Sequence, residues 1–317
     1  MDSYLIGELA AITGSLFWSF CTIFFAFSSK RVGAHNVNGI RILMAMGLLT
    51  ITHLVIYGTI IPHANRLQWF YLGLSGFIGL ALGDLMYFGS LVILGPRKGV
   101  LIMATNPIFS AIAGYFILDE ILNVYAIIGI SITLCGVSWV ILERDIEKEN
   151  GGANKKLDDR KKICGVLLGI GGAIGQGVGL VISKYGMENV ADDKMAPLSP
   201  LSATFIRVFI AGISFVFILL LMNKFSNMLK SFNDRKATVA IFGGALLGPF
   251  LGVFLSMVAV TYTQTGIAST LLSLMPVMII PIVWVLYKQK TSWRGFIGAI
   301  LTILGVAILF LMGILTK

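Results

Sequence analysis

The chain has 317 residues, of which 57% are hydrophobic and only 12% are charged. Because soluble domains are less apolar and carry about twice that share of charge, composition excludes a water-soluble fold. The net charge of +9 does not indicate nucleic-acid binding, since the basic residues lie in short segments between apolar stretches and not on one soluble face.

Uncharged stretches of about 20 residues, the length that crosses a bilayer as a helix, follow one another along the chain. The stretch 237–287 is too long for one crossing, and its polar run 261–265 marks a hairpin inside it. The sequence therefore predicts an all-α integral membrane protein with ten transmembrane helices. Their predicted ranges are 5–28, 37–58, 69–93, 98–118, 122–142, 163–183, 201–222, 237–260, 266–287 and 294–313.

The first two spans carry three candidate residues, Glu8, Trp18 and Arg41. Glu8 lies near the start of the first span, where an acid can reach water. Trp18 lies deeper in the same span, as a candidate cavity residue or as interhelical packing. Arg41 lies a few residues into the second span. It either reaches the interface as an anchor or acts as a gate or counter-ion for an anionic substrate.

Asp84 is the strongest candidate for a functional residue, because it lies among apolar neighbours well inside the third span. A charged acid at bilayer depth costs ~2.5–3.5 kcal/mol even on lenient insertion scales, so intramembrane acids are functional hypotheses by default. Asp84 either faces a wet cavity, where it binds substrate or a proton, or is held by a neighbouring helix. Tyr87 follows one turn later as a further candidate cavity residue.

Prolines interrupt the fourth and ninth spans near their middle, at Pro107 and Pro276. Proline removes an amide donor and kinks a helix, and interrupted helices often mark the site of a transporter. We expect a shared hinge or cavity wall at these positions, with a simple packing kink as the alternative. Asn106 and Ser273, which lie beside the two prolines, are candidate cavity residues.

The second half of the chain repeats this pattern. Gln176 in the sixth span and Ser256 in the eighth are candidate cavity residues, and Arg207 lies a few residues into the seventh span, as Arg41 does in the second. For each of these polar residues, a satisfied interhelical contact is the alternative. Glycines four residues apart, which allow close helix packing, recur in three spans, as Gly79 and Gly83, as Gly171, Gly175 and Gly179, and as Gly244, Gly248 and Gly252.

Residues of the first half recur in the second half at an offset of 169. The matched pairs are Gly79 and Gly248, Gly83 and Gly252, Pro107 and Pro276, Gly129 and Gly298, Gly136 and Gly305, and Val137 and Val306. Because five spans is an odd number, the second copy enters the membrane from the opposite side. We therefore predict two inverted five-helix repeats, at residues 1–143 and 163–317, joined by a polar cytoplasmic linker at residues 144–162.

The distribution of charge predicts the orientation in the membrane. Of the 24 lysines and arginines, 18 lie in the odd-numbered connections and only four on the opposite side. By the positive-inside rule the odd-numbered connections are cytoplasmic and both termini lie outside. We expect a multi-pass protein of the plasma (inner) membrane.

Several local patterns recur in a fixed order. They are Gly83-Asp84 followed by Tyr87-Phe88, a basic turn at Arg97-Lys98, Asn106-Pro107, Asp119-Glu120 at the end of the fourth span, and a glycine-rich fifth span that ends in Gly136-Val137. Together with the duplication, this order resembles the EamA branch of the drug/metabolite transporter superfamily over nearly the whole chain. The resemblance implies a ten-helix carrier of small metabolites, often an exporter, with a central cavity between two five-helix bundles.

The sequence departs from the family pattern where the second half would end its fourth helix with acids. The counterparts of Asp119 and Glu120 are Lys288 and Gln289. The acidic pair therefore cannot serve symmetrically in both repeats, and a role at the interface is as plausible as a mechanistic one.

We interpret the chain as a secondary transporter that moves a small organic metabolite by alternating access, with amino-acid export as the family-level expectation. The predicted partners are this solute and the lipid bilayer, and protons are a candidate coupling ion through Asp84. The alternative is a non-transport membrane scaffold or an intramembrane enzyme. No H-E-x-x-H, Walker, G-x-S-x-G or Cys/His pattern occurs, so we predict no enzymatic activity, metal or cofactor.

Overall fold

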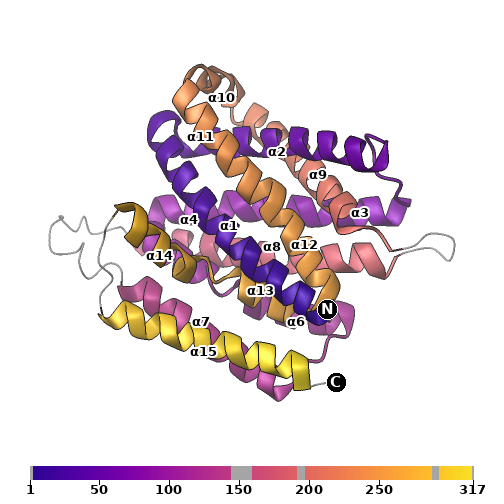
Figure 1. Ribbon diagram of the computed structural model, residues 1–317. Helices are drawn as coiled ribbons and strands as arrows, with labels where there is room; N and C mark the ends of the chain where they lie inside the picture. The colour runs from indigo at the N-terminus through magenta and orange to yellow at the C-terminus, as the bar shows by residue number, and fades with distance from the viewer. Residues whose placement is uncertain (1–2, 144–158, 191–196, 288–292, 316–317) are drawn as a thin grey trace.

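The computed structural model describes residues 3–143, 159–190, 197–287 and 293–315 (Figure 1). All regular secondary structure within these ranges is helical, and no strand occurs in them. The all-α fold predicted from composition is therefore confirmed.

The first half of the chain forms α1 (Ser3–Val32), α2 (Ala34–Tyr57), α3 (Arg66–Ser75), η1 (Gly76–Gly83), α4 (Asp84–Leu94), α5 (Pro96–Met103), α6 (Asn106–Leu118) and α7 (Val124–Glu143). The second half forms α8 (Asp159–Glu188), α9 (Pro200–Leu221), α10 (Phe225–Lys230), η3 (Ser231–Asn233), α11 (Arg235–Ala245), η4 (Leu246–Gly252), α12 (Val253–Tyr262), α13 (Thr265–Leu272), α14 (Met275–Tyr287) and α15 (Trp293–Leu315).

Local sequence explains where several of these helices begin and end. Gly58 ends α2 in the left-handed conformation, with φ +69°, which strains residues that carry a side chain. Asn65 begins α3 with a capping box. Its side chain accepts from the Gln68 amide at 2.7 Å, and Gln68 Oε1 accepts from the Asn65 amide at 3.0 Å.

Within the described residues, eight helical stretches are long and apolar enough to cross a membrane. They are Ser3–Val32, Asn36–Tyr57, Arg66–Leu94, Lys98–Leu118, Val124–Ile141, Asp159–Glu188, Pro200–Leu221 and Arg235–Tyr262. They coincide with the first eight predicted spans. The ninth and tenth predicted spans coincide with shorter apolar helices, Thr265–Ile279 and Gly295–Phe310, so the count of ten crossings stays a prediction.

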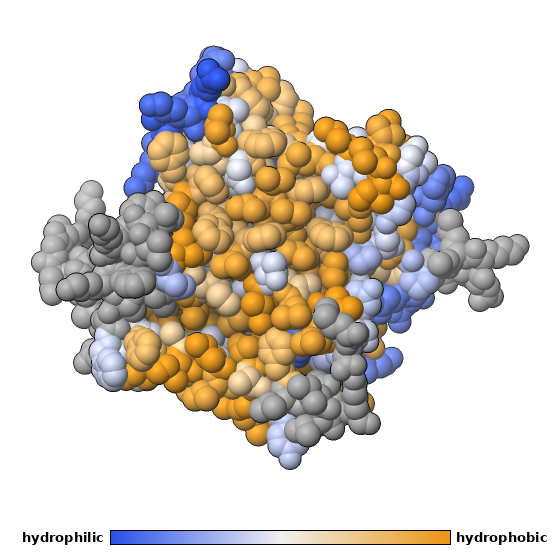
Figure 2. Space-filling model, viewed as in Figure 1, coloured by the Kyte–Doolittle hydropathy of each residue, from blue (hydrophilic) through white to orange (hydrophobic). Residues whose placement is uncertain are grey.

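The connections between helices gather at two opposite ends of the molecule (Figure 1). We call one the N-terminal end, because it carries the start of α1 together with the turns at 58–65, 119–123 and 263–264. We call the other the basic end. It carries the end of α1 and the starts of α5, α8, α10 and α11, and the described cations in or beside these segments are Lys30, Arg31, Lys98, Arg160, Lys161, Lys162, Lys224, Lys230, Arg235 and Lys236. Figure 2 shows apolar residues covering the face between more hydrophilic patches at the two ends.

The helices α7 and α15 occupy matching positions in the two halves and lie side by side at one edge (Figure 1). A Cβ on Gly129 would lie 2.8 Å from Leu309 Cδ2, whereas a Cβ on Gly136 would lie 2.8 Å from the Gly298 carbonyl oxygen. A later residue of α7 therefore meets an earlier residue of α15. The two helices are antiparallel and approach each other through glycines on both sides.

The remaining helices interleave the two halves. The first helix of each half packs on the third helix of the other, because α1 contacts α11 and α12, and α8 contacts α3 and α4. Likewise α2 contacts α11, and α9 contacts α3. We call α3–α6 with α8 and α9 the first bundle, and α1, α2 and α11–α14 the second bundle. Each bundle, so defined, combines helices from both sequence repeats.

Two irregularities recur in both halves. The third helix contains a π-helical segment, η1 in the first half and η4 in the second, a feature that often accompanies functional sites. The fourth helix is interrupted, since α5 gives way to α6 and α13 gives way to α14. Pro107 and Pro276 are each the second residue of the new helix, where the missing amide needs no partner. Sequence reasoning predicted a kink near these prolines, and the structure shows a full break.

Candidate functional site

Asp84 is the first residue after the π-helical segment η1 and is 8% exposed. Gln176 of α8 donates from Nε2 to Asp84 Oδ1 at 2.7 Å. The guanidinium of Arg41, from α2, donates to Asp84 Oδ2. The acid is thus held by two helices, one from each bundle, as in the structural alternative that the sequence left open.

Arg41 lies about two turns into α2, roughly 10 Å along the helix from its start. It is 4% exposed, so it does not extend to the membrane interface as an anchor would. Its Nε donates to Asn38 Oδ1 at 2.5 Å. The guanidinium lies 5.4 Å from the ring centre of Phe25 and 5.5 Å from that of Phe88, within the range of cation–π attraction.

A small cavity of about 10 Å³ adjoins this ion pair, room for about one water molecule. Matched positions of the two halves supply its walls, since Leu80 and Asp84 are the counterparts of Pro249 and Val253. The lining residues are Trp18, Arg41, Ile42, Leu80, Asp84, Val208, Ala211, Pro249 and Val253. The cavity therefore lies between the two bundles, where matched residues of the two repeats meet.

Arg207 differs from Arg41 in having no acid beside it. It is 3% exposed, its Nη1 donates to Met257 Sδ at 3.1 Å, and its Nε has no hydrogen-bond partner. A Cβ on Gly79 of η1 would lie 3.6 Å from Nη2. Among the residues with described side chains, no carboxylate comes within ion-pair distance of this guanidinium. The interfacial anchor proposed from sequence does not fit this burial.

Trp18 and Gln176, which match at an offset of 158 in the first helices of the two halves, lie against equivalent π-helical segments. A Cβ on Gly252 would lie 2.7 Å from Trp18 Nε1, and one on Gly83 would lie 3.6 Å from Gln176 Cγ. The sequence correctly placed these two residues at equivalent depths. Tyr87 is half-buried one turn beyond Asp84 on α4.

The other candidate cavity residues are not brought to Asp84. Asn106 begins α6, and its Oδ1 is buried without a partner beside Gly177 of α8. Ser256 donates to the Gly252 carbonyl at 2.7 Å and Ser273 to the Ser269 carbonyl at 2.8 Å. These serines satisfy their hydroxyls on their own helices.

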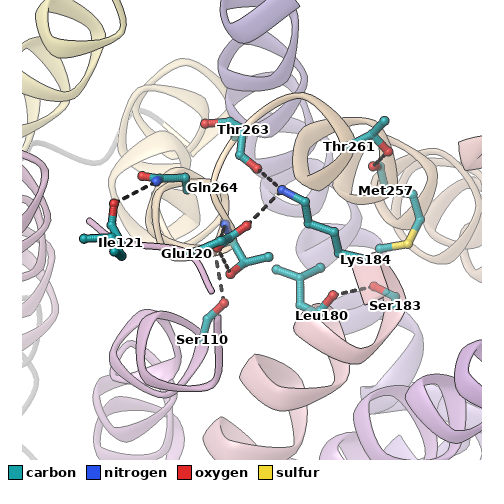
Figure 3. Close-up of polar contacts among 11 residues, drawn as sticks. Ser110, Glu120, Ile121, Leu180, Ser183, Lys184, Met257, Thr261, Thr263 and Gln264 are labelled. Atoms are coloured by element: carbon teal, nitrogen blue, oxygen red, sulfur yellow. Dashed lines mark hydrogen bonds and ion pairs between the residues drawn. The ribbon is translucent and has the colours of Figure 1, made fainter. Parts of the chain in front are cut away.

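A second polar cluster closes the N-terminal end (Figure 3). Lys184 of α8 contacts Glu120 Oε1 at 2.9 Å and donates to the Thr263 carbonyl at 3.0 Å. Glu120 Oε2 accepts from the amide of Thr265 at 2.8 Å and from its hydroxyl at 2.6 Å. The acid and the lysine belong to the first bundle and the threonines to the second, so this cluster joins the bundles.

Sequence reasoning did not assign Lys184 to a site. A signal was available, because Glu120 and Lys184 are opposite charges at the predicted outer ends of two spans. Gln264 adds a donation to the Ile121 carbonyl at 3.0 Å, and Tyr57 donates to Ser199 at 2.9 Å. At the basic end, no hydrogen bond or ion pair between described residues joins the two bundles, and the Arg31–Asp234 pair lies within the second bundle.

Two further acids, Glu8 and Asp234, lie in different surroundings. Glu8 is 2% exposed and its Oε1 has no hydrogen-bond partner, so the expectation that it reaches water is wrong. Asp234 caps α11 outside the membrane-spanning helices, and hydrogen bonds from the Ala237 amide and from Arg31 hold its pKa below the usual value.

Within the described ranges, no group of three or more His, Cys, Asp or Glu side chains could hold a metal ion.

Comparisons with known proteins give a matching family and a solved structure with the same fold. The pattern of the EamA-like transporter family matches residues 5–142 and again residues 163–311. No curated protein matches the sequence. A solved structure described only as "Crystal structure of protein" is 16% identical, covers 96% of each chain and superposes with a TM-score of 0.72. At that identity the likeness shows a shared fold.

Proposed function

Because the chain belongs to the EamA-like transporter family, we propose that it is a secondary transporter that moves a small organic metabolite by alternating access. The family consists of membrane transporters of small molecules. The observation that carries the proposal is the central cavity, whose walls are matched residues of the two halves and whose polar side chains include a buried acid and a buried arginine. Such midplane sites between repeats are typical of secondary transporters.

Ten crossings in two inverted repeats are part of this proposal. The antiparallel contacts of α7 with α15 support it. The alternation of connections between the two ends in Figure 1 supports it as well, because each helical stretch joins one end to the other. The cations at the basic end support a cytoplasmic position for that end in the plasma membrane, with both termini outside.

The contacts between the bundles support a conformation that is closed at the N-terminal end. Polar contacts between the bundles are concentrated there, and the central cavity has room for about one water. In the proposed cycle these contacts break when the bundles move apart on that side. The moving bodies are the interleaved bundles, so α8 travels with α3–α6.

The test of transport is uptake and efflux in proteoliposomes with a metabolite panel that includes amino acids, with and without a pH gradient. We expect at least one solute to move. If no compound moves in either direction, the carrier function fails. Proton coupling predicts that Asp84→Asn abolishes the response to the gradient, whereas simple facilitated passage predicts no response in the parent.

A scaffold or an intramembrane enzyme would need no solute path between the bundles. Single cysteines at Tyr87 or Gln176, in a chain that lacks Cys21, Cys135 and Cys164, separate these alternatives. A carrier exposes them to a polar thiol reagent during turnover. Permanent protection under all gradients supports the scaffold.

Loss of the Glu120 charge is expected to open the N-terminal end. Glu120→Gln removes the ion pair with Lys184 and weakens the hydrogen bonds from Thr265. Since hydrogen bonds to a charged group contribute about 1.5–3 kcal/mol, the reaction rate of a cysteine at Ser110, buried beside Thr265, with a polar maleimide is expected to rise about tenfold or more. The matched control is Asp119→Asn, an exposed acid at the adjacent position. An equal rise in the control, or none in Glu120→Gln, contradicts the closure.

Removal of the helix-breaking prolines is expected to slow transport without unfolding the protein. Alanine at Pro107 or Pro276 restores an amide donor and permits a continuous helix. We expect a several-fold lower transport rate with an unchanged unfolding midpoint. Pro281→Ala, at an exposed proline inside α14, is the control and keeps the parental rate. Parental transport in the Pro107 and Pro276 variants would remove their hinge role.

A further inference from the structure

The two arginines of the core lie in matched surroundings. Arg41 and Arg207 match at an offset of 166, as do Ile42 and Val208, which both line the central cavity. Arg41 contacts Asp84 and, one turn further along α4, Phe88. Arg207 contacts Met257, which is the counterpart of Phe88 at the offset of 169. The second arginine therefore approaches the same part of the third helix as the first.

The counterpart of Asp84 in this second arrangement is Val253. Arg207 consequently has a neighbouring helix in the expected place but no carboxylate on it. A buried charge without a partner is strongly unfavourable. Asp84 neutralises Arg41, whereas Nε of Arg207 has no partner, so a single negative charge beside Arg207 would neutralise the second arginine as well.

A hydrogen-bond donor is also repeated. In the first arrangement Gln176 donates to Asp84 at 2.7 Å. Its counterpart Trp18 lies against Gly252, the residue before Val253, and lines the cavity together with Val253. Among the described residues, no hydrogen bond engages Trp18 Nε1. The second arrangement therefore has the cation and the donor that hold a carboxylate, but lacks the carboxylate.

We propose that a small organic monocarboxylate binds between Arg207 and Trp18, beside Val253, and that its carboxylate takes the part that Asp84 takes in the other half of the molecule. This site deepens the proposed transport function and rests on it for the solute that is carried. Arginine suits the role because its planar guanidinium can hold both carboxylate oxygens. Trp18 and Val253 line the cavity of about 10 Å³ and Arg207 does not, so in this proposal the solute reaches the guanidinium once the bundles separate.

Binding is tested by thermal unfolding of the purified full-length chain with sodium lactate and sodium benzoate, against lactamide and benzamide as uncharged equivalents. The carboxylates are expected to raise the unfolding midpoint, and the amides to leave it unchanged. Arg207→Gln is expected to weaken the carboxylate response roughly 10- to 100-fold in concentration. The control is Arg235→Gln, an exposed arginine at the start of α11. Equal stabilisation by amides, or an unchanged response in Arg207→Gln, overturns the site.

Arg207→Gln also distinguishes this site from a structural role. If Arg207 only held the fold together, its replacement would lower the unfolding midpoint without ligand. Because the variant removes an uncompensated buried charge, we expect the midpoint without ligand to be equal or higher. A lower midpoint without ligand contradicts the proposal.

A second test introduces an acid by substitution at Val253, the position that matches Asp84. Val253 is 3% exposed, so an aspartate there is tolerated only if a cation reaches it. Val253→Asp is expected to fold with Arg207 present, to lose the carboxylate response, and to unfold at a lower temperature when combined with Arg207→Gln. Val253→Asn is the uncharged control and shows no such dependence on Arg207. If Val253→Asp is equally unstable with and without Arg207, the two positions do not form the site.

The carrier function and this site fail separately. If proteoliposomes move no solute while carboxylates still stabilise the protein through Arg207, the transport function fails and the site stands. If solutes move and Arg207→Gln transports carboxylates as the parent does, the site fails and the carrier stands.

Discussion

Replacement of Asp84 by alanine is expected to lower the free energy of unfolding by about 3–5 kcal/mol, the usual effect of removing one partner from a buried ion pair. Among the described residues, Arg41 would keep Asn38 as its hydrogen-bond partner and the rings of Phe25 and Phe88 as cation–π partners, at 4% exposure. The side-chain amide of Gln176 would lose its acceptor. Denaturation of the purified protein in lipid nanodiscs measures the change.

The double variant Asp84→Leu with Arg41→Met tests whether the unpaired charge causes this loss. Apolar replacement of a whole buried pair is often neutral or stabilising, so we expect stability within about 1 kcal/mol of the parent, together with lost transport. Arg31→Ala is the control, because it breaks an ion pair whose arginine is 41% exposed and leaves Asp234 in place as the cap of α11, and such pairs add little. If the double variant is no more stable than Asp84→Ala, the destabilisation has another source.

Leucine at Gly136 is expected to be the second large perturbation. A Cβ there would lie 2.5 Å from the Thr302 backbone nitrogen, and one on Gly305, its counterpart, would lie 2.5 Å from that of Thr133. The obstacle is backbone in both cases, so α7 and α15 must separate. Overpacking costs about 1–3 kcal/mol where side chains yield, and we expect the upper part of that range or beyond.

The symmetry of this contact makes the prediction specific. Gly305→Leu is expected to destabilise the protein about as much as Gly136→Leu, because each glycine meets the same part of the other helix. Gly47→Ala is the control. A Cβ on Gly47 meets nothing within 4 Å, and alanine favours a helix by about 0.5–1 kcal/mol over glycine. A harmless Gly136→Leu, measured by thermal unfolding, would contradict the close approach.

Sequence reasoning located the apolar helices well, because their length follows from the thickness of the bilayer. Hydrocarbon offers no hydrogen bonds, so a crossing segment must satisfy its backbone internally as a helix. The break in the stretch 237–287 was placed at 261–265, and α12 ends at Tyr262 while α13 begins at Thr265. Asp84 was selected because a charged acid inside the hydrocarbon needs a partner or water to offset its cost.

The partners of Asp84 came only from the structure. Arg41 is 43 residues away and Gln176 is 92 residues away, and nothing in their spacing along the chain relates them. The sequence assigned Arg41 and Arg207 the same two roles. Their environments differ because Asp84 is matched by Val253. This difference could be applied to the two arginines only after the structure showed that each faces the third helix of its own half.

The sequence by itself determined which segments are apolar helices, that both halves carry the same family pattern, and between which helices the basic residues lie. The tertiary structure alone decided which faces of the helices meet, that the first helices pack on the opposite half, and where the π-helical segments and breaks fall. The physical reason lies in the solvent. Lipid tails are as apolar as leucine, so residues that face lipid and residues that face protein look alike in the sequence, and helix packing depends on close approach and on a few buried polar pairs.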